Sequence, residues 1–312
     1  MSIIKSSLLG FAVGDALGLP IQFIPRENFP AKITGMIGFG TYNMPAGTWS
    51  DDTSLTLATI DSICTKNKID YEDIMQKFVS WLNDNNYTPF GKSFDIGDTC
   101  LSSISNYIYK GKDPLQCGDN SINSNGNGSL MRMLPLALYC YYCNCSNNKI
   151  IEFAKNLSSL THRHEISQLG CYIYVQFVVE LIKTKNKNKS YKYIQNLDYS
   201  CFLENSLFAY HRILENNIYE FDINEIKSSG YVVDTLEASL WCLINNNSYE
   251  DSVITAINLG DDTDTIGAIT GSMAGILYGY DEIPERFLNE LQKKDDLINY
   301  AQIFEKTLKS LK

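Results

Sequence analysis

The sequence predicts an all-α fold, a compact single-domain helical bundle that spans residues 1–312. Apolar residues recur at helical spacing along most of the chain, and no alternation of strands with helices, as in a βαβ unit, is visible. The length equals about two average domains, but no long linker and no repeat of solenoid period divides it. With 44% hydrophobic residues, the chain can bury a sizeable core.

The individual helices are predicted from apolar spacing and from capping residues. In the segment 70–82, Ile74, Phe78 and Leu82 recur every four residues behind Asp70, a residue type that favours the position before a helix. The apolar stretch 169–182 could be a buried helix or a core strand, and its length favours a helix. The run 265–280 is too short to span a bilayer, which takes about 20 apolar residues, and its small residues suit a helix packed closely in a core. The remaining helices are expected at 7–18, 53–64, 97–109, 149–160, 165–183, 231–244 and 285–310.

Charge and cysteine content argue against several classes of protein. Lys and Arg total 26 against 36 Asp and Glu, giving a formal net charge of −10, and an acidic chain repels the phosphate backbones of nucleic acids. The nine cysteines are scattered, and the N-terminus reaches Asp15 before it completes an apolar signal-peptide core, so we expect a reducing, cytoplasmic setting without a membrane segment. Cys140, Cys143 and Cys145 lack a second paired half and are better interpreted as small buried hydrophobes than as a zinc site.

Two short acidic clusters carry the strongest chemical signal. The first reads WSDDT at 49–53 and the second GDDTDT at 260–265, and each opens an apolar helical run. Helix capping is the plain alternative, but one cap needs only one such side chain, and several carboxylates in one turn repel one another unless a cation offsets them. If the clusters converge, their oxygen ligands suit Mg²⁺ or Mn²⁺, and two such ions can polarise substrate oxygens and activate water.

Three further motifs have both a chemical and a structural interpretation. The loop SNGNGS at 124–129 precedes an apolar helical run, so its backbone N–H groups could bind phosphate, or it could be an ordinary Asn/Gly turn. Asp95, in FDIGDT at 94–99, could cap a helix or face a pocket. His162, in LTHRH at 160–164, could be no more than a partner for the end of a helix.

Seven segments resemble, in order, the ADP-ribosylglycohydrolase family, which includes dinitrogenase reductase-activating glycohydrolase. They are GDALGLPIQF (14–23), TGMIGFGTYNMPAGTWSDDTSLTLA (34–58), FDIGDT (94–99), SNGNGSLMRMLPLAL (124–138), LTHRHE (160–165), GYVVDTLEASLW (230–241) and NLGDDTDTIGAITGSMAGILYG (258–279). Seven motifs in the right order are far more specific than a single DDT. The resemblance implies an all-α single domain of this type with a central cleft that holds two Mg²⁺ or Mn²⁺ ions.

The resemblance also implies roles for individual residues. Asp95 matches a position proposed to contact a guanidinium and to serve as a base, so Asp95, Asp52 and Gln22 form the expected catalytic set. Asp261 stands where many members have glycine and is not assigned as a ligand. Tyr231 matches a position that lines the ligand cleft, although it could equally be a core aromatic. The implied metal ligands are Ser50, Asp51, Asp52, Asp262, Asp264 and Thr265, and the implied ligand-binding residues are Gly126, Asn127, Gly128, Ser129, His162 and Tyr231.

The implied activity is metal-dependent hydrolysis of the bond between C1″ of the distal ribose and a modified side chain, most often arginine on a protein. An oxocarbenium-like transition state gains from nearby negative charge, and Asp95 suits a cationic guanidinium. The expected partner is ADP-ribose or an ADP-ribosylated protein, and we expect a monomer. Gln22 stands where many members carry Glu, and Gln cannot act as a general base. Two alternatives stay open: a module that binds ADP-ribose without turnover, and a hydrolase of serine-linked, acetyl-ester-linked or nucleobase-linked ADP-ribose.

Overall fold

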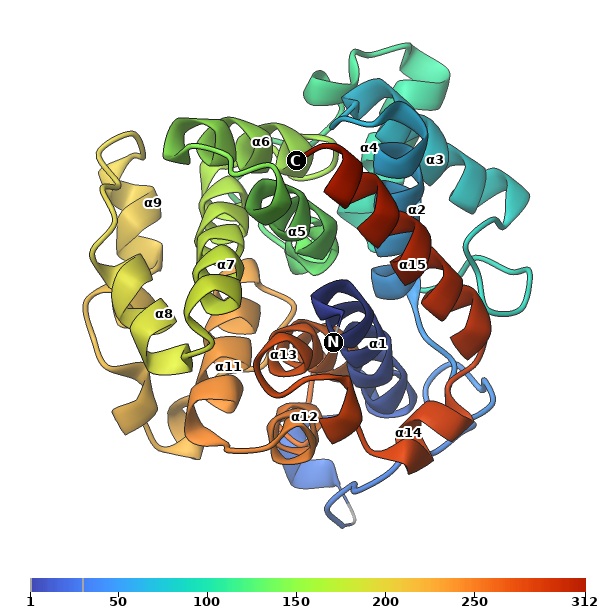
Figure 1. Ribbon diagram of the computed structural model, residues 1–312, viewed down its shortest axis with the longest axis vertical. Helices are drawn as coiled ribbons and strands as arrows, with labels where there is room; N and C mark the ends of the chain where they lie inside the picture. The colour runs from blue at the N-terminus through green and yellow to red at the C-terminus, as the bar shows by residue number, and fades with distance from the viewer. Residues whose placement is uncertain (1, 30) are drawn as a thin grey trace.

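The computed structural model describes residues 2–29 and 31–312, and within them it contains α-helices and short 3₁₀ turns but no strand, as predicted (Figure 1). The α-helices are α1 (Ile3–Gly18), α2 (Asp51–Lys66), α3 (Tyr71–Asp84), α4 (Asp98–Lys110), α5 (Leu134–Tyr142), α6 (Asn147–Ser159), α7 (Glu165–Thr184), α8 (Lys187–Gln195), α9 (Glu204–Ala209), α10 (His211–Leu214), α11 (Val232–Asn245), α12 (Tyr249–Ile257), α13 (Thr263–Tyr278), α14 (Glu285–Glu290) and α15 (Lys294–Ser310). A six-residue 3₁₀ helix, Asn127–Arg132, precedes α5.

Helices α1 and α13 lie side by side at the centre of the bundle (Figure 1). A Cβ atom on Gly14 would lie 2.0 Å from the carbonyl oxygen of Gly267, and a Cβ atom on Gly271 would lie 2.2 Å from that of Gly10. Only glycine permits backbones to approach this closely, because it has no Cβ. The antiparallel contact continues to Gly18, which lies against Thr263. The first and last thirds of the chain are therefore joined at the N-terminal end of α13.

Every predicted helix except the one over 285–310 is present, with ends that shift by a few residues. The ambiguous stretch 169–182 is helical and lies within α7. Asp70 caps α3, since its side chain accepts a hydrogen bond from the backbone N–H of Asp73 at 3.1 Å. Helix α1 begins at Ile3, earlier than expected, because the Ser2 hydroxyl accepts a hydrogen bond from the N–H of Lys5 and caps it.

The single helix predicted over 285–310 is wrong, because the chain breaks between α14 and α15. Lys293 adopts a left-handed conformation with φ of 54°, which a continuous helix cannot include. The segment before α2 holds the break in place: Gln292 donates its backbone N–H to the carbonyl of Gly47, and Trp49 donates its indole N–H to the carbonyl of Gln292, both at 3.0 Å. These contacts join residues about 245 positions apart, so the local apolar spacing could not predict them.

Two observations bear on the cellular setting. Among the described residues, one helical segment, Ile3–Ile21, is long and apolar enough to cross a membrane by length and composition, and it is mostly buried inside the bundle. All nine cysteines are free. Cys140 is buried, and Cys143 and Cys145 are partly buried, in agreement with their interpretation as packing residues.

Candidate active site

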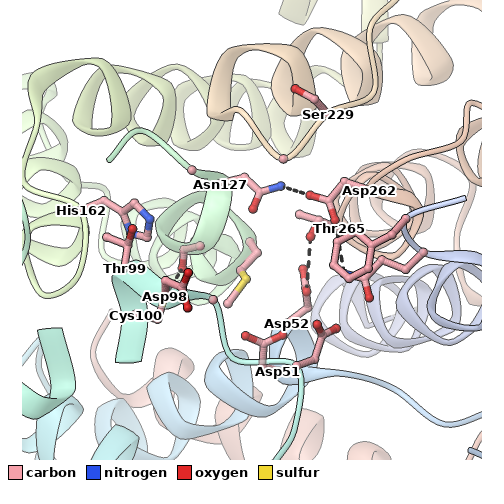
Figure 2. A pocket seen from close by; sticks show the side chains of 18 of the residues that line it. Asp51, Asp52, Asp98, Thr99, Cys100, Asn127, His162, Ser229, Asp262 and Thr265 are labelled. Carbon is pink, nitrogen blue, oxygen red and sulfur yellow. Dashed lines mark hydrogen bonds between the residues drawn. The ribbon is translucent and has the colours of Figure 1, made fainter. Parts of the chain in front are cut away.

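The two acidic clusters meet at a cavity of about 570 Å³. The Thr265 hydroxyl donates a hydrogen bond to Oδ2 of Asp52 at 3.4 Å, across 213 residues of sequence. In Figure 2, Asp51 and Asp52 lie on one side of this cavity, and Asp262 and Thr265 on another. The fold thus brings together the N-terminal ends of α2 and α13. The cavity is lined by Gln22, Phe23, Asp51, Asp52, Asp95, Gly97, Asp98, Thr99, Cys100, Gly126, Asn127, Gly128, Met131, His162, Ser229, Gly230, Asp261, Asp262 and Thr265.

The first cluster occupies the first turn of α2. Ser50 is the N-cap, and its hydroxyl oxygen accepts the backbone N–H of Asp52 at 3.2 Å and lies 3.1 Å from Oδ2 of Asp52, to which it donates. Capping therefore explains Ser50 but neither aspartate. Asp51 and Asp52 are both buried, and Oδ1 of Asp52 has no hydrogen-bond partner among the described residues.

Behind this turn lies Asp15 of α1, a residue that the sequence analysis did not assign. Its fully buried carboxylate accepts the backbone N–H of Ser50 at 2.9 Å and both the N–H and the hydroxyl of Thr53, at 3.1 and 2.6 Å. Burial raises the pKa of Asp15 to about 6, although the hydrogen bonds from Thr53 and Ser50 act in the opposite direction. Asp15 therefore orients the turn that carries Asp51 and Asp52. Its presence in the motif GDALG was the signal that could have identified it.

The second cluster opens α13. Asp262 occupies the N-cap position but makes no side-chain cap. Instead, its Oδ1 accepts the side-chain amide of Gln22 at 3.4 Å, and its Oδ2 accepts the side-chain amide of Asn127 (Figure 2). Asp264 is fully buried, and neither of its oxygens has a partner among the described residues. The capping alternative is thus wrong for this cluster.

The electrostatics of the cluster oppose full ionisation. Burial, the largest cause, and the neighbouring carboxylates raise the pKa of Asp51, Asp52 and Asp264 well above the usual range of an aspartate. Burial also raises the pKa of Asp262, partly offset by the hydrogen bond from Asn127. Carboxylates that are buried together in this way gain from a cation placed between them.

Internal hydrogen bonds among the described residues leave several buried oxygens of the site without a partner. The buried oxygens without a hydrogen-bond partner in the described chain include Oε1 of Gln22, Oδ1 of Asp52, Oδ2 of Asp95 and both carboxylate oxygens of Asp264. Such hard oxygens are the ligands that Mg²⁺ and Mn²⁺ prefer. In the described part of the chain, however, no three acidic, His or Cys side chains already surround one point as a finished coordination shell. The residues therefore supply suitable oxygen ligands, but these ligands are not arranged as a complete coordination shell.

Asp95 reaches the cavity from the loop before α4 and does not cap that helix, whose N-cap is Gly97. The Tyr42 hydroxyl donates a short hydrogen bond to its Oδ1, and the Tyr42 ring packs against Phe94 with ring centroids 5.4 Å apart. Burial raises the pKa of Asp95 to about 7, while the hydrogen bond from Tyr42 opposes this rise. Tyr42 is a second residue that the sequence analysis missed, since only the fold brings its loop to Asp95.

The glycine loop and His162 form another wall of the cavity. Gly126 pairs with Tyr231 in an isolated antiparallel bridge, and the N–H of Asn127 donates to the carbonyl of Gly230 at 3.0 Å. A Cβ on Gly128 would lie 2.8 Å from Sγ of Cys100 and 2.9 Å from Cε1 of His162, so only glycine fits there. His162 is buried and lines the cavity. Its backbone N–H also donates to the carbonyl of Ser158 in the last turn of α6 at 2.8 Å, so it is a partner for the end of that helix as well.

Four residues predicted for the site do not line the cavity itself. Ser50 and Asp264 are buried behind its acidic wall. Ser129 is also fully buried, and its hydroxyl contacts Sγ of Cys171 at 3.4 Å, so its side chain faces the core. Tyr231, the N-cap residue of α11, is 37% exposed beside the glycine loop, which rules out the core-aromatic alternative. Asp98, Cys100 and Ser229 line the cavity and were not predicted.

The chain is similar to known proteins over nearly its whole length. The profile of the family described as ADP-ribosylglycohydrolase matches residues 2–311. The ADP-ribosylarginine hydrolase Tri1 of Serratia proteamaculans is 30% identical over 299 residues, which cover 96% of this chain and 77% of that protein. The ADP-ribosyl-[dinitrogen reductase] glycohydrolase of Rhodospirillum rubrum is 30% identical, over 92% of this chain and 90% of that protein. A solved structure described as an ADP-ribosylglycohydrolase-related protein complex superposes with a TM-score of 0.83 at 27% identity, covering 98% of both chains.

Proposed function

The chain belongs to the ADP-ribosylglycohydrolase family of glycosidic-bond hydrolases, and from this premise we propose that it is a metal-dependent hydrolase of ADP-ribosyl-arginine on protein. The observation that carries the proposal is the meeting of Asp52 and Thr265 at one cavity, which unites two acidic clusters from opposite ends of the sequence. We also infer that residues 1–312 act as one domain, since α1 and α13 share the centre of the bundle.

Two divalent ions would be held by Ser50, Asp51, Asp52, Asp262, Asp264 and Thr265. When bound, Mg²⁺ or Mn²⁺ supplies polarisation of substrate oxygens and lowers the pKa of a water molecule. The choice of these metals is supported by the oxygen-only donor set and by the unpartnered oxygens of Asp52 and Asp264. The buried negative charge of the same residues favours the positive charge that develops on the ribose in the transition state.

Asp95 would contact the departing guanidinium and move a proton. Its pKa of about 7 places it near the value that suits a general base at neutral pH. Tyr42 occupies Oδ1, whereas Oδ2 has no partner among the described residues, so one oxygen of Asp95 is free to serve the substrate. The negative charge of Asp95 also attracts a guanidinium in preference to a neutral acceptor such as serine.

The diphosphate of ADP-ribose would lie against the glycine loop. Gly126 and Gly128 keep side chains out of that wall, and backbone N–H groups at the start of the 3₁₀ helix Asn127–Arg132 can donate to phosphate oxygens. His162 is neutral at physiological pH, because burial and the charge of Arg132 lower its pKa to about 3, so it would contribute shape and hydrogen bonding instead of charge.

A second candidate function is recognition of ADP-ribose without turnover. Gln22 motivates this second function. Its side-chain amide donates to Asp262, and a Glu at this position could act as a general base, whereas Gln cannot. Asp95 offers another base in the same cavity, and this favours hydrolysis over recognition.

The test is release of free ADP-ribose from an ADP-ribosyl-arginine protein, with Mg²⁺ or Mn²⁺ and with a chelator as control. Metal-dependent release that is lost in Asp52→Asn is the expected result. A panel of serine-linked, acetyl-ester-linked and nucleobase-linked ADP-ribose runs in parallel. Inert arginine conjugates beside an active alternative linkage would overturn the arginine assignment. Tight ADP-ribose binding without any product would instead favour the recognition module.

A further inference from the structure

Phe23 is an exposed aromatic at the edge of the cavity. It follows Gln22 directly, lines the cavity and keeps 61% of its surface exposed. Its backbone is held in place by Asp261, whose carbonyl accepts the N–H of Phe23 at 2.6 Å and whose N–H donates to the carbonyl of Ile24 at 3.0 Å. Phe23 is therefore fixed beside the acidic wall.

A second exposed phenylalanine, Phe39, stands on the neighbouring loop and is 70% exposed. This loop closes through a hydrogen bond from the N–H of Phe39 to the carbonyl of Met44 at 2.7 Å. The hydroxyl of Thr41 anchors it to the carbonyl of Gln22, also at 2.7 Å, and Tyr42 anchors it to Asp95. The loop thus borders the cavity between Gln22 and Asp95, although Phe39 itself does not line it.

Both phenylalanines have backbones in the left-handed region, with φ of 66° at Phe23 and 61° at Phe39. Bulky residues rarely adopt this conformation, and it persists where surrounding contacts impose it, commonly at ligand-binding sites. A single exposed apolar residue is ordinary. Two of them in strained conformations, one in the cavity wall and the other on the loop bonded to Gln22 and Asp95, indicate a surface that contacts a partner.

The charge around these two residues restricts the partner. Of the six aspartates that line the cavity, Asp95, Asp98 and Asp261 are not among the proposed metal ligands, and no Lys or Arg lines it among the described residues. Asp98 and Asp261 are exposed. Acidic side chains attract basic segments, and aromatic faces also bind guanidinium and ammonium groups. The surface therefore suits a basic polypeptide better than an acidic or purely apolar one.

We propose that Phe23 and Phe39 form a docking surface for the basic polypeptide segment that carries the modified arginine of the protein substrate. The proposal rests on the proposed function. The scissile bond must lie by the acidic clusters, and Gln22, which contacts Asp262, directly precedes Phe23. Asp95, which would contact the guanidinium, is bonded to Tyr42 of the Phe39 loop, so the polypeptide beyond the guanidinium would leave the cavity past this loop and Phe23.

The experiment compares kcat/KM on an ADP-ribosylated basic peptide with kcat/KM on free ADP-ribosyl-arginine. We expect Phe39→Ala to lower the peptide value by about tenfold, the effect of losing one well-placed interface aromatic, and to leave the small-substrate value unchanged. Phe23→Ala, which also removes part of the cavity wall, should lower the peptide value more than the small-substrate value. Phe208→Ala is the matched control, because Phe208 is 72% exposed on α9 and should change neither value.

An equal loss on both substrates in Phe39→Ala, or no loss on the peptide, would overturn the docking surface. Failure of the proposed function is separable, since the wild-type protein would then release ADP-ribose from neither substrate. In that case the docking surface is tested by calorimetry, which compares the affinities of the wild type and of Phe39→Ala for the same peptide and for free ADP-ribose. Phe39→Ala must weaken binding of the peptide and leave binding of ADP-ribose unchanged. Any other result rejects the docking surface.

Discussion

Thr53 donates two hydrogen bonds to Asp15, one from its backbone N–H at 3.1 Å and one from its hydroxyl at 2.6 Å. These bonds tie the first turn of α2 to α1, which in turn packs on the backbone of α13. Asp15 therefore links the two helices whose N-terminal ends carry the acidic clusters. It acts as a positioning residue, because it does not line the cavity.

Asp15→Asn should weaken Mn²⁺ binding by about 10- to 100-fold, the usual cost of losing a partner that orients metal ligands. An amide can accept at only one of its two ends, so at least one donor from Ser50 or Thr53 would face an N–H₂ group. Titration calorimetry with Mn²⁺ measures the change. Asp61→Asn, on the same helix α2 but bonded to Tyr87 and Lys77, is the control. Unchanged Mn²⁺ affinity in Asp15→Asn would refute the positioning role.

Gln22→Glu should raise kcat by about tenfold in the presence of Mn²⁺, because it adds a carboxylate that can act as a base beside Asp262. The same change should lower the melting temperature in chelator, since the new charge is buried among carboxylates and replaces a donor. Steady-state release of ADP-ribose and thermal unfolding measure the two effects. Gln302→Glu, at an exposed position of α15, adds the same charge elsewhere and should alter neither. A fall in kcat in Gln22→Glu would contradict this prediction.

His162 should make the protein less stable as pH falls from 7 to 5. Its folded pKa of about 3 lies below its ordinary value of 6.5, so the unfolded chain binds more protons over this interval and unfolding becomes easier. The loss from this one group is about 2 kcal/mol between pH 7 and pH 5.

Replacement by His162→Asn removes that contribution, so the variant should lose about 2 kcal/mol less than the wild type over the same interval. Urea unfolding at both pH values measures the difference, and the opposing effect of raised carboxylate pKa values cancels because both proteins share it. His211→Gln, at a half-exposed site, should behave like the wild type. Equal losses of unfolding free energy between pH 7 and pH 5 in the wild type and in His162→Asn would disprove the lowered pKa of His162.

Gly267→Ala should destabilise the fold by about 1–3 kcal/mol or more, because its Cβ would lie 2.5 Å from the backbone oxygen of Gly14 and neither helix can yield locally. The same displacement should weaken Mn²⁺ binding, since Gly267 lies one turn after Asp264. Gly35→Ala, whose Cβ would meet nothing within 4 Å, is the control. Wild-type stability in Gly267→Ala would show that the two helices can separate without cost.

The sequence by itself determined the helical class and the position of most of the longer helices, because apolar spacing and capping are local properties. The shorter helices α8, α9, α10 and α12 were not predicted. Asp70 could be recognised as a cap from its own neighbourhood, and its hydrogen bond to Asp73 is as predicted. The acidic clusters at 49–53 and 260–265 could be singled out for the same reason, since the mutual repulsion of adjacent carboxylates is visible in the sequence.

Only the tertiary structure decided which of these residues meet. The break at Lys293 depends on contacts with Gly47 and Trp49, and the convergence of Asp52 with Thr265 spans 213 residues. Tyr42 reaches Asp95 only through the folded loop. Periodicity carries no information about such pairs, because their contact energy depends on distances that the whole core fixes. The glycine contacts between α1 and α13 set those distances and thereby bring the acidic clusters to one cavity.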